Sequence, residues 1–328
     1  MGAAWTIQIV TGVLLASRYA PIWNTYFGII SIMQDIRTGY LVRFAHSNGA
    51  RLLFLLLFTH TSRGLYYKSY KKTNTWYTGS TALLITIGVS FIGYVLPNNQ
   101  MSYWGCIVIT SILTEVPLIG ENLVTVIWGG LEINHFTINR LFALHFFLPL
   151  IAIIILISHI LALHTSGSRN PTGLSSSNYK AYFLSFSLIK DIWAMSLIGT
   201  LFLILVLLKP LIMGDHDNFS IANKIDTPHH IQPEWYFLFA YAILRSVPSK
   251  AGGVIALVIS VIVIIILPKV APTPKAKSLL YRNIFWLFVG SFVTLTFLGS
   301  KPVEPPYPLI ANVITIIYFS FFIFAPKL

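Results

Sequence analysis

The sequence predicts an all-α membrane protein with eight transmembrane helices. Of its 328 residues, 55% are hydrophobic and only 10% are charged. The apolar residues gather in runs close to the roughly 20 that an α-helix needs to cross a bilayer, and the charged residues lie between these runs. Because a water-soluble domain has no need of such a composition, we expect a polytopic protein held in lipid.

The net charge of +12 could suit nucleic-acid binding, but the basic residues follow the loops between apolar runs, which is the pattern of membrane orientation. We therefore expect no nucleic-acid partner. The single cysteine, Cys106, excludes an intramolecular disulfide and a cysteine-ligated cluster. No basic region precedes the apolar start at Gly2, so no cleavable targeting peptide is predicted.

Eight apolar segments can be drawn. They are residues 3–17, 40–64, 79–96, 141–164, 192–208, 252–267, 284–298 and 309–325. The first is short for a crossing, Pro97 ends the third, and the last four carry no charged residue. We divide the chain into an N-terminal four-helix bundle, 1–170, and a C-terminal membrane region, 171–328, with a loop and four helices.

The loop charges orient these segments. The loops after the second, fourth and sixth segments are mainly basic, with Arg63, Lys68, Lys71, Lys72, Arg169, Lys180, Lys190, Lys269, Lys275, Lys277 and Arg282. The alternate loops hold most of the acidic residues, namely Glu115, Glu121, Glu132, Asp215, Asp217, Asp226 and Glu234. Basic loops tend to stay on the side of synthesis, so this alternation fixes the direction of each segment.

Two of the segments carry histidines at the same interval. His46 and His60 are 14 residues apart, as are His145 and His159. At about 100° and 1.5 Å per residue, each pair shares one helix face, within about 40°, and is separated by roughly 21 Å along the axis. The predicted orientation places His46 beside His145 and His60 beside His159.

A lone histidine on an apolar helix is usually a hydrogen-bonded core residue. Four of them at matched spacing are different, because ionisable groups inside a membrane are costly and usually functional. Neutral imidazole is an axial ligand of haem iron, so we expect two bis-histidine haems. Zinc is less suitable, since its ligands should lie closer together than four helical turns.

Glycines repeat the interval on the third segment, at Gly79 and Gly93. Glycine lets a flat ring approach the backbone, although membrane helices also use small residues for packing. Gly12 would need its matching partner three positions before Met1, so we expect the chain to be truncated at its N-terminus or to begin at an internal start.

Three arginines lie on the second segment. Arg43 and Arg63 flank its histidines and could bind haem propionates, or they could be ordinary interfacial charges. Arg51 lies inside the segment, about 140° around the helix from His46, and the sequence offers no role for it.

Taken together, these residues resemble mitochondrial cytochrome b, the haem-carrying subunit of the ubiquinol–cytochrome c reductase, respiratory complex III. The resemblance covers nearly the whole chain. It rests on His46–Ala50, Arg63–Tyr67, Gly93–Pro97, Gln100–Gly105, Trp128–Gly130, Gly167–Pro171, Pro233–Tyr236, Phe237–Ser246 and Lys301–Glu304. The chain departs from the family pattern at Asn98, Asn99, His229, Arg169 and Arg51.

The resemblance implies a quinol-oxidising site in which Glu234 accepts a proton, with Tyr94 and Tyr241 as neighbours. Without the resemblance, Glu234 is simply a carboxylate in the first turn of a helix. A quinone-reducing site on the opposite face would use His164, Ser168, Lys190 and Asp191, which could also be interfacial anchors.

The resemblance also implies a mechanism and its setting. The chain would bind two non-covalent b-type haems, with His46 and His145 on the low-potential one and His60 and His159 on the high-potential one. It would couple oxidation of ubiquinol to reduction of ubiquinone and to proton translocation, as a proton-translocating reductase subunit. The implied partners are the Rieske iron–sulfur protein, cytochrome c1, other complex III subunits, membrane lipid and a second copy of the complex, in the mitochondrial inner membrane.

Two other classes stay open. A transporter or channel would be polytopic with buried polar groups, but it would have no use for matched histidine intervals. A relative without turnover could retain haem. The loop histidines His216, His229 and His230 could suggest a metal site, although solvated loop histidines explain them more simply.

Overall fold

A computed structural model describes residues 1–21, 25–168, 180–270 and 278–328. Within these ranges the chain forms twelve α-helices and no strand, so the predicted all-α class is confirmed. The helices are α1 (Gly2–Ala16), α2 (Thr25–Gln34), α3 (Gly39–Tyr66), α4 (Thr73–Val95), α5 (Gln100–Ser111), α6 (Gly120–Trp128), α7 (His135–Ser166), α8 (Ile189–Leu208), α9 (Leu238–Ser246), α10 (Lys250–Val270), α11 (Leu279–Gly299) and α12 (Tyr307–Phe324). The orienting residues Arg169, Lys275 and Lys277 lie outside the described residues.

Seven helices in the described part of the chain are long and apolar enough to cross a membrane: α3, α4, α7, α10, α11, α12, and α8 together with the π-helical turn Phe183–Leu188 that precedes it. They coincide with the second to eighth predicted segments. The first, α1, has only 15 residues, so the predicted count of eight is not confirmed.

Several crossing helices begin earlier than predicted, and α4 and α7 have polar first turns. α4 begins at Thr73 rather than Gly79, and α7 begins at His135 rather than Leu141. Apolarity alone misses these polar first turns. In α7 the start is fixed by Asn134, whose side chain accepts from the backbone N–H groups of Phe136 and Thr137 and so satisfies donors that the helix leaves unpaired.

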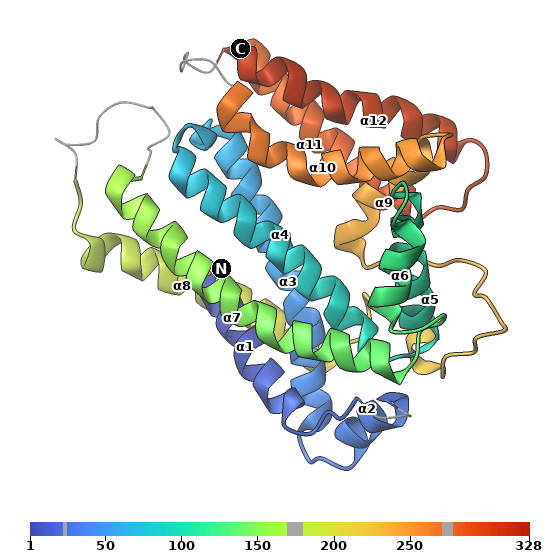
Figure 1. Cartoon of the computed structure of the whole chain (residues 1–328). Coiled ribbons are helices and arrows are strands. Elements are labelled where there is room, and N and C mark those ends of the chain that lie inside the picture. The colour runs from blue at the N-terminus through green and yellow to red at the C-terminus, as the bar shows by residue number, and fades with distance from the viewer. Residues whose placement is uncertain (22–24, 169–179, 271–277) are drawn as a thin grey trace.

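The helices form two groups (Figure 1). In the first, α4 packs along α7 and α1 packs along α3. In the second, α9 packs with α10, α11 and α12 around a shared hydrophobic core. The groups are joined where the Trp76 indole of α4 donates to the backbone carbonyl of Ile264 in α10, at 2.7 Å. The division at residue 170 stays a prediction.

The short turn Trp235–Phe237 (η5) leads into α9 and reaches the first helix group. Tyr236 of η5 is buried with Trp5 of α1, Phe54 of α3 and Leu83 of α4. This packing carries the preceding residue, Glu234, from the C-terminal half of the chain to the wall of the N-terminal bundle.

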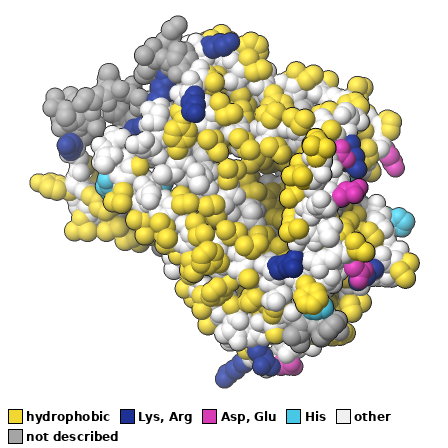
Figure 2. Space-filling model, viewed as in Figure 1, with side chains coloured by type: hydrophobic (Ala, Val, Ile, Leu, Met, Phe, Trp, Pro, Cys, Tyr) yellow, Lys and Arg dark blue, Asp and Glu magenta, His cyan; other side chains and the backbone are white. Residues whose placement is uncertain are grey.

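Hydrophobic side chains cover most of the visible face, and charged side chains lie mainly at its margins (Figure 2). The helix α7 shows the same feature residue by residue, because Phe147, Ile154 and Leu161 are all exposed. An apolar exterior of this kind is what a bilayer solvates.

Asn98 and Asn99, which depart from the pattern of the family that the sequence resembles, form the turn between α4 and α5. Asn98 has φ of +50°, a left-handed conformation in which asparagine is favoured over most residues. Asn99 caps α5, since its side chain accepts from the backbone N–H of Ser102 at 2.9 Å. These departures therefore have a local structural reason.

Candidate functional site

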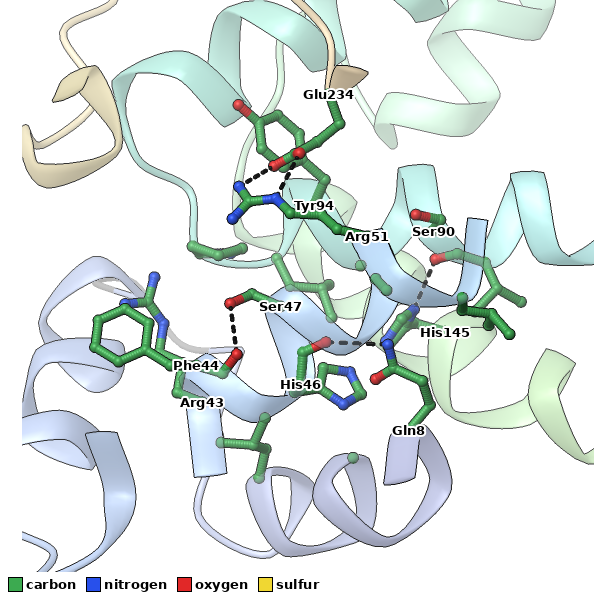
Figure 3. A pocket seen from close by; sticks show the side chains of 18 of the residues that line it. Gln8, Arg43, Phe44, His46, Ser47, Arg51, Ser90, Tyr94, His145 and Glu234 are labelled. Atoms are coloured by element: carbon green, nitrogen blue, oxygen red, sulfur yellow. Dashed lines mark hydrogen bonds and ion pairs between the residues drawn. The ribbon is translucent and has the colours of Figure 1, made fainter. Parts of the chain in front are cut away.

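A cavity of about 300 Å³ lies inside the first helix group. Its wall is contributed by α1, α3, α4 and α7 and by the segment that precedes α9. Both His46 and His145 line it, and so do Arg51, Tyr94 and Glu234 (Figure 3). One continuous cavity thus contains residues from the predicted haem site and from the predicted quinol-oxidising site.

The histidines lie in the two pairs that the loop charges predict. The ring centroids of His46 and His145 are 6.2 Å apart, and those of His60 and His159 are 6.3 Å apart. A metal–imidazole bond is about 2 Å long, and the ligating nitrogen lies roughly 1.1 Å from its ring centroid, as bond lengths near 1.35 Å require. Two imidazoles that ligate one metal ion from opposite sides would therefore have centroids about 6.2 Å apart.

Hydrogen bonds fix the tautomers of three of these rings. The Nδ1 atom of His145 lies 2.9 Å from the carbonyl oxygen of Val89, and that of His159 lies 2.8 Å from the carbonyl oxygen of Thr75. A carbonyl can only accept, so each Nδ1 carries the proton and each Nε2 keeps its lone pair for a metal.

His46 is held in the same tautomer, with the proton on Nδ1, by a hydroxyl group. Its Nδ1 lies 2.9 Å from Thr11 Oγ1, and that hydroxyl donates its own proton to the carbonyl of Ile7 at 2.5 Å. The hydroxyl must therefore accept from His46 Nδ1–H. Gln8 holds the backbone at the same place by donating to the carbonyl of His46 at 3.0 Å.

Three glycines face three of the histidine rings. A Cβ added at Gly12 would lie 3.1 Å from Cε1 of His46, and one added at Gly79 would lie 2.8 Å from Cε1 of His159. The crowding is closest at Gly93, against His145. The glycines thus give the imidazoles room to stand against neighbouring helices, which is a cradle that a side chain would fill.

Arg43 and Arg63, the two arginines that flank the histidines of α3, contact other side chains in the structure. Their predicted role, binding the haem propionates, stays a prediction. Arg43 lines the cavity and its Nη1 contacts the sulfur of Met33 at 2.6 Å. Arg63, in the last turn of α3, has its guanidinium 5.9 Å from the ring centroid of Tyr67.

Arg51 has a partner that the sequence did not reveal. Its Nε and Nη2 donate to the two carboxylate oxygens of Glu234, at 2.9 and 2.8 Å, on the side of the helix away from His46 (Figure 3). A signal was present: an arginine inside an apolar helix calls for a counter-charge, and Glu234 is one of few acids on that side.

Two tyrosines lie around Glu234. Tyr94 lines the cavity and donates to Asn218 at 3.4 Å. Tyr236, which was not singled out from the sequence, shares a 2.7 Å hydrogen bond with Ser90. Burial and the Glu234 charge raise the pKa of Tyr236, so its hydroxyl stays protonated. Tyr241 does not line this cavity; the Arg245 guanidinium covers its ring at 4.9 Å.

The four residues of the predicted quinone-reducing site are exposed near the other ends of α7 and α8. His164 Nδ1 lies 2.8 Å from the Ile160 carbonyl of its own helix. Ser168 follows α7, and Lys190 lies 3.9 Å above the ring of Phe186 beside Asp191. Residues 169–179 between them are not described, so this site stays a prediction.

The loop histidines His216, His229 and His230 do not form one cluster that could hold a metal ion. His216 lies beside Asp215 and Asp217, at 3.4 and 3.3 Å, and is almost fully exposed. His230 Nε2 instead lies 3.1 Å from the carbonyl of Ser300. His229 is exposed.

Comparison with known proteins agrees with this geometry. Residues 1–167 match the family model described as cytochrome b/b6/petB, and residues 221–319 match the one described as cytochrome b(C-terminal)/b6/petD. The fold is similar to a chain of a solved structure described as a hyperthermophilic respiratory Complex III, with a TM-score of 0.93 and 28% sequence identity over 99% of this chain and 88% of that chain. Together, the two matched regions make this chain a member of the cytochrome b/b6 family.

Proposed function

We propose that the chain is the cytochrome b subunit of a ubiquinol–cytochrome c reductase and that it binds two non-covalent b-type haems. The observation that carries the proposal is the pair of imidazole separations, 6.2 and 6.3 Å, each suited to one iron between two rings. When bound, the haems supply one-electron transfer along the bundle.

The protein's own residues hold and orient these groups. His46 and His145 would ligate the low-potential haem, and His60 and His159 the high-potential one. The acceptors at Nδ1 of His46, His145 and His159 leave Nε2 of each ring available to ligate iron, and such partners would tune ligand basicity. Arg43 and Arg63 would bind the propionates through charge-assisted hydrogen bonds.

Substrate chemistry would occur at both ends of the bundle. Ubiquinol would lose a proton to Glu234, with Tyr94 beside it, in the same cavity as His46 and His145. Ubiquinone would be reduced near His164, Ser168, Lys190 and Asp191. Protons would be released on one face and taken up on the other, so that the reaction builds a proton gradient.

The assembly follows from the same proposal. One electron of each quinol would leave to a Rieske iron–sulfur protein and then to cytochrome c1, while the other would cross the bundle to quinone. The apolar exterior leaves room for lipid, for further subunits and for a second copy of the complex. The location proposed is the mitochondrial inner membrane.

A redox-titrated difference spectrum of membranes containing the chain, with haem quantified per polypeptide, tests the proposal. We expect two b-type haems at separate potentials, one lost in His145→Ala and the other in His159→Ala. The exposed loop histidine variant His216→Ala is the control and should retain both. Absence of haem, or haem indifferent to both substitutions, would overturn the proposal in favour of a transporter.

A further inference from the structure

Arg51 and Glu234 form a buried, bidentate ion pair, with two parallel hydrogen bonds, between α3 and the segment before η5. The side chains are 7% and 13% exposed, and both oxygens of the carboxylate accept from the guanidinium. The two residues are 183 positions apart in sequence. A planar two-bond pair of this kind fixes the orientation of the carboxylate as well as its charge.

A third residue fixes the guanidinium in turn. Asn48, one helical turn before Arg51, accepts from Arg51 Nη1 through Oδ1 at 3.0 Å. The Asn48 amide nitrogen donates to the carbonyls of Phe44 and Pro210, at 3.1 and 3.0 Å. Asn48 is fully buried, so this network orients Arg51 from the side opposite Glu234.

The pair stands at the cavity wall, not in a helix–helix core. Both members line the cavity, and the other titratable groups lining it are Tyr19, Arg43, His46, Tyr94, His145, Asp215 and Tyr236. Of these groups, Tyr94 from α4 and Tyr236 from η5 interact electrostatically with the Glu234 carboxylate, and both are uncharged phenols. Arg51 is therefore the cation that faces Glu234 most directly.

A buried ion pair is a weak source of stability, because desolvation of the two charges offsets their attraction. Apolar residues of similar size would serve as well or better for joining α3 to η5. The position of the pair at the wall of a functional cavity points instead to control of the carboxylate.

We propose that Arg51 is the positioning residue of the quinol-oxidising site, holding the Glu234 carboxylate oriented at the cavity wall. The inference rests on the proposed function. A quinol O–H bond breaks as its proton passes to a Glu234 oxygen, leaving a quinol anion and a neutral carboxyl group. The ion pair then becomes a lone cation beside a neutral acid, so Arg51 favours release of that proton onward and return of the carboxylate.

The test is the pH dependence of ubiquinol oxidation by the purified complex that contains this chain. Glu234 must be ionised to accept a proton, so its protonation sets the acid limb of kcat/KM. Arg51→Gln removes the opposite charge, and we expect the acid limb to move toward higher pH. Arg51→Lys keeps the charge without the two-bond geometry and should give a smaller shift in the same direction.

Three further variants separate the possibilities. Arg140→Gln is the matched control, because that arginine donates to the Val126 carbonyl and should leave the limb in place. In Glu234→Gln the limb should disappear with a fall in kcat, and Arg51→Gln combined with Glu234→Gln should match Glu234→Gln alone. Haem content per polypeptide is measured in every variant, since a structural role would change assembly without moving the limb.

The outcomes distinguish the inference from the proposed function. If Glu234→Gln leaves quinol oxidation unchanged in haem-loaded complex, the quinol site is misassigned. If Glu234→Gln is impaired but the limb of Arg51→Gln and Arg51→Lys stays at the original pH, Arg51 is only structural and the inference is overturned. Should Arg51→Gln not assemble, an unshifted limb in Arg51→Lys is enough to overturn it.

Discussion

Gly93 of α4 lies so close to the imidazole of His145 on α7 that a Cβ at position 93 would collide with the ring. The helices α4 and α7 can therefore lie this close together because residue 93 has no side chain. It is the tightest of the three glycine–histidine contacts, and its effect can be measured directly.

Gly93→Ala should displace the His145 ring and lower the content of one haem, while the other haem is retained. The measurement is haem per polypeptide from reduced-minus-oxidised spectra. Gly88→Ala on the same helix is the matched control, because a Cβ there meets nothing within 4 Å. Alanine also favours the helix over glycine by about 1 kcal/mol, so loss of haem in both variants would contradict a steric cause.

Thr11→Val should weaken the proposed low-potential haem site without removing a proposed ligand. The variant deletes the hydroxyl that accepts from His46 Nδ1, and loss of such a partner typically costs about 10–100-fold in metal affinity. Haem retention during dilution and a shifted potential are the readouts. Thr11→Ser should behave as wild type. Thr6→Val, on the exposed part of α1, should also do so, since its hydroxyl only bonds the Gly2 carbonyl.

Tyr236→Phe should destabilise the contact between η5 and α4. The ring keeps its stacking on Phe54, 4.0 Å between centroids, but loses the hydrogen bond with Ser90. We expect a loss of about 1 kcal/mol, read as a lower Tm of the detergent-solubilised complex. Tyr40→Phe, at a half-exposed position, should leave Tm unchanged.

The same variant has a distinct pH dependence. Burial, followed by the Glu234 charge, raises the pKa of Tyr236 in the folded protein. Its stabilisation is therefore complete below the unfolded pKa of about 10 and is lost as pH rises above that value. The difference in Tm between wild type and Tyr236→Phe should be constant from pH 6 to about 9 and narrow above about 10; widening with pH would contradict the sign.

Cys106 should be inert in the folded chain. It is fully buried on α5, and burial raises the pKa of its thiol to about 12. At pH 8 about one thiol in ten thousand is then ionised, and the thiolate is the reactive form. Maleimide should label the native protein negligibly and label one equivalent after denaturation in SDS. Labelling of the native protein at the denatured rate would show that α5 opens.

The crossing helices could be predicted because the bilayer imposes their length and apolarity. The short helices α2, α5, α6 and α9 were not predicted. They contain 9 to 12 residues, and tertiary contacts rather than a membrane define them. In α9, for example, Phe239, Ala242 and Ile243 are buried in the core shared with α11 and α12.

The contacts in the candidate site also divide into those that the sequence predicts and those that it does not. The pairing of His46 with His145 followed from helix geometry and loop charge, because both are local properties of the sequence. The partner of Arg51 did not, since Glu234 reaches it only through the packing of Tyr236 against Phe54. Similarly, no local pattern shows that Thr11 would meet His46.

The shared interval of 14 residues in α3 and α7 makes these helices intolerant of changes in length. One inserted residue between His46 and His60 would turn the second imidazole by about 100° and shift it by about 1.5 Å, away from His159. A substitution in the same stretch leaves that alignment intact. Between the histidines, a substitution therefore preserves the register of the paired imidazoles, whereas an insertion or a deletion removes it.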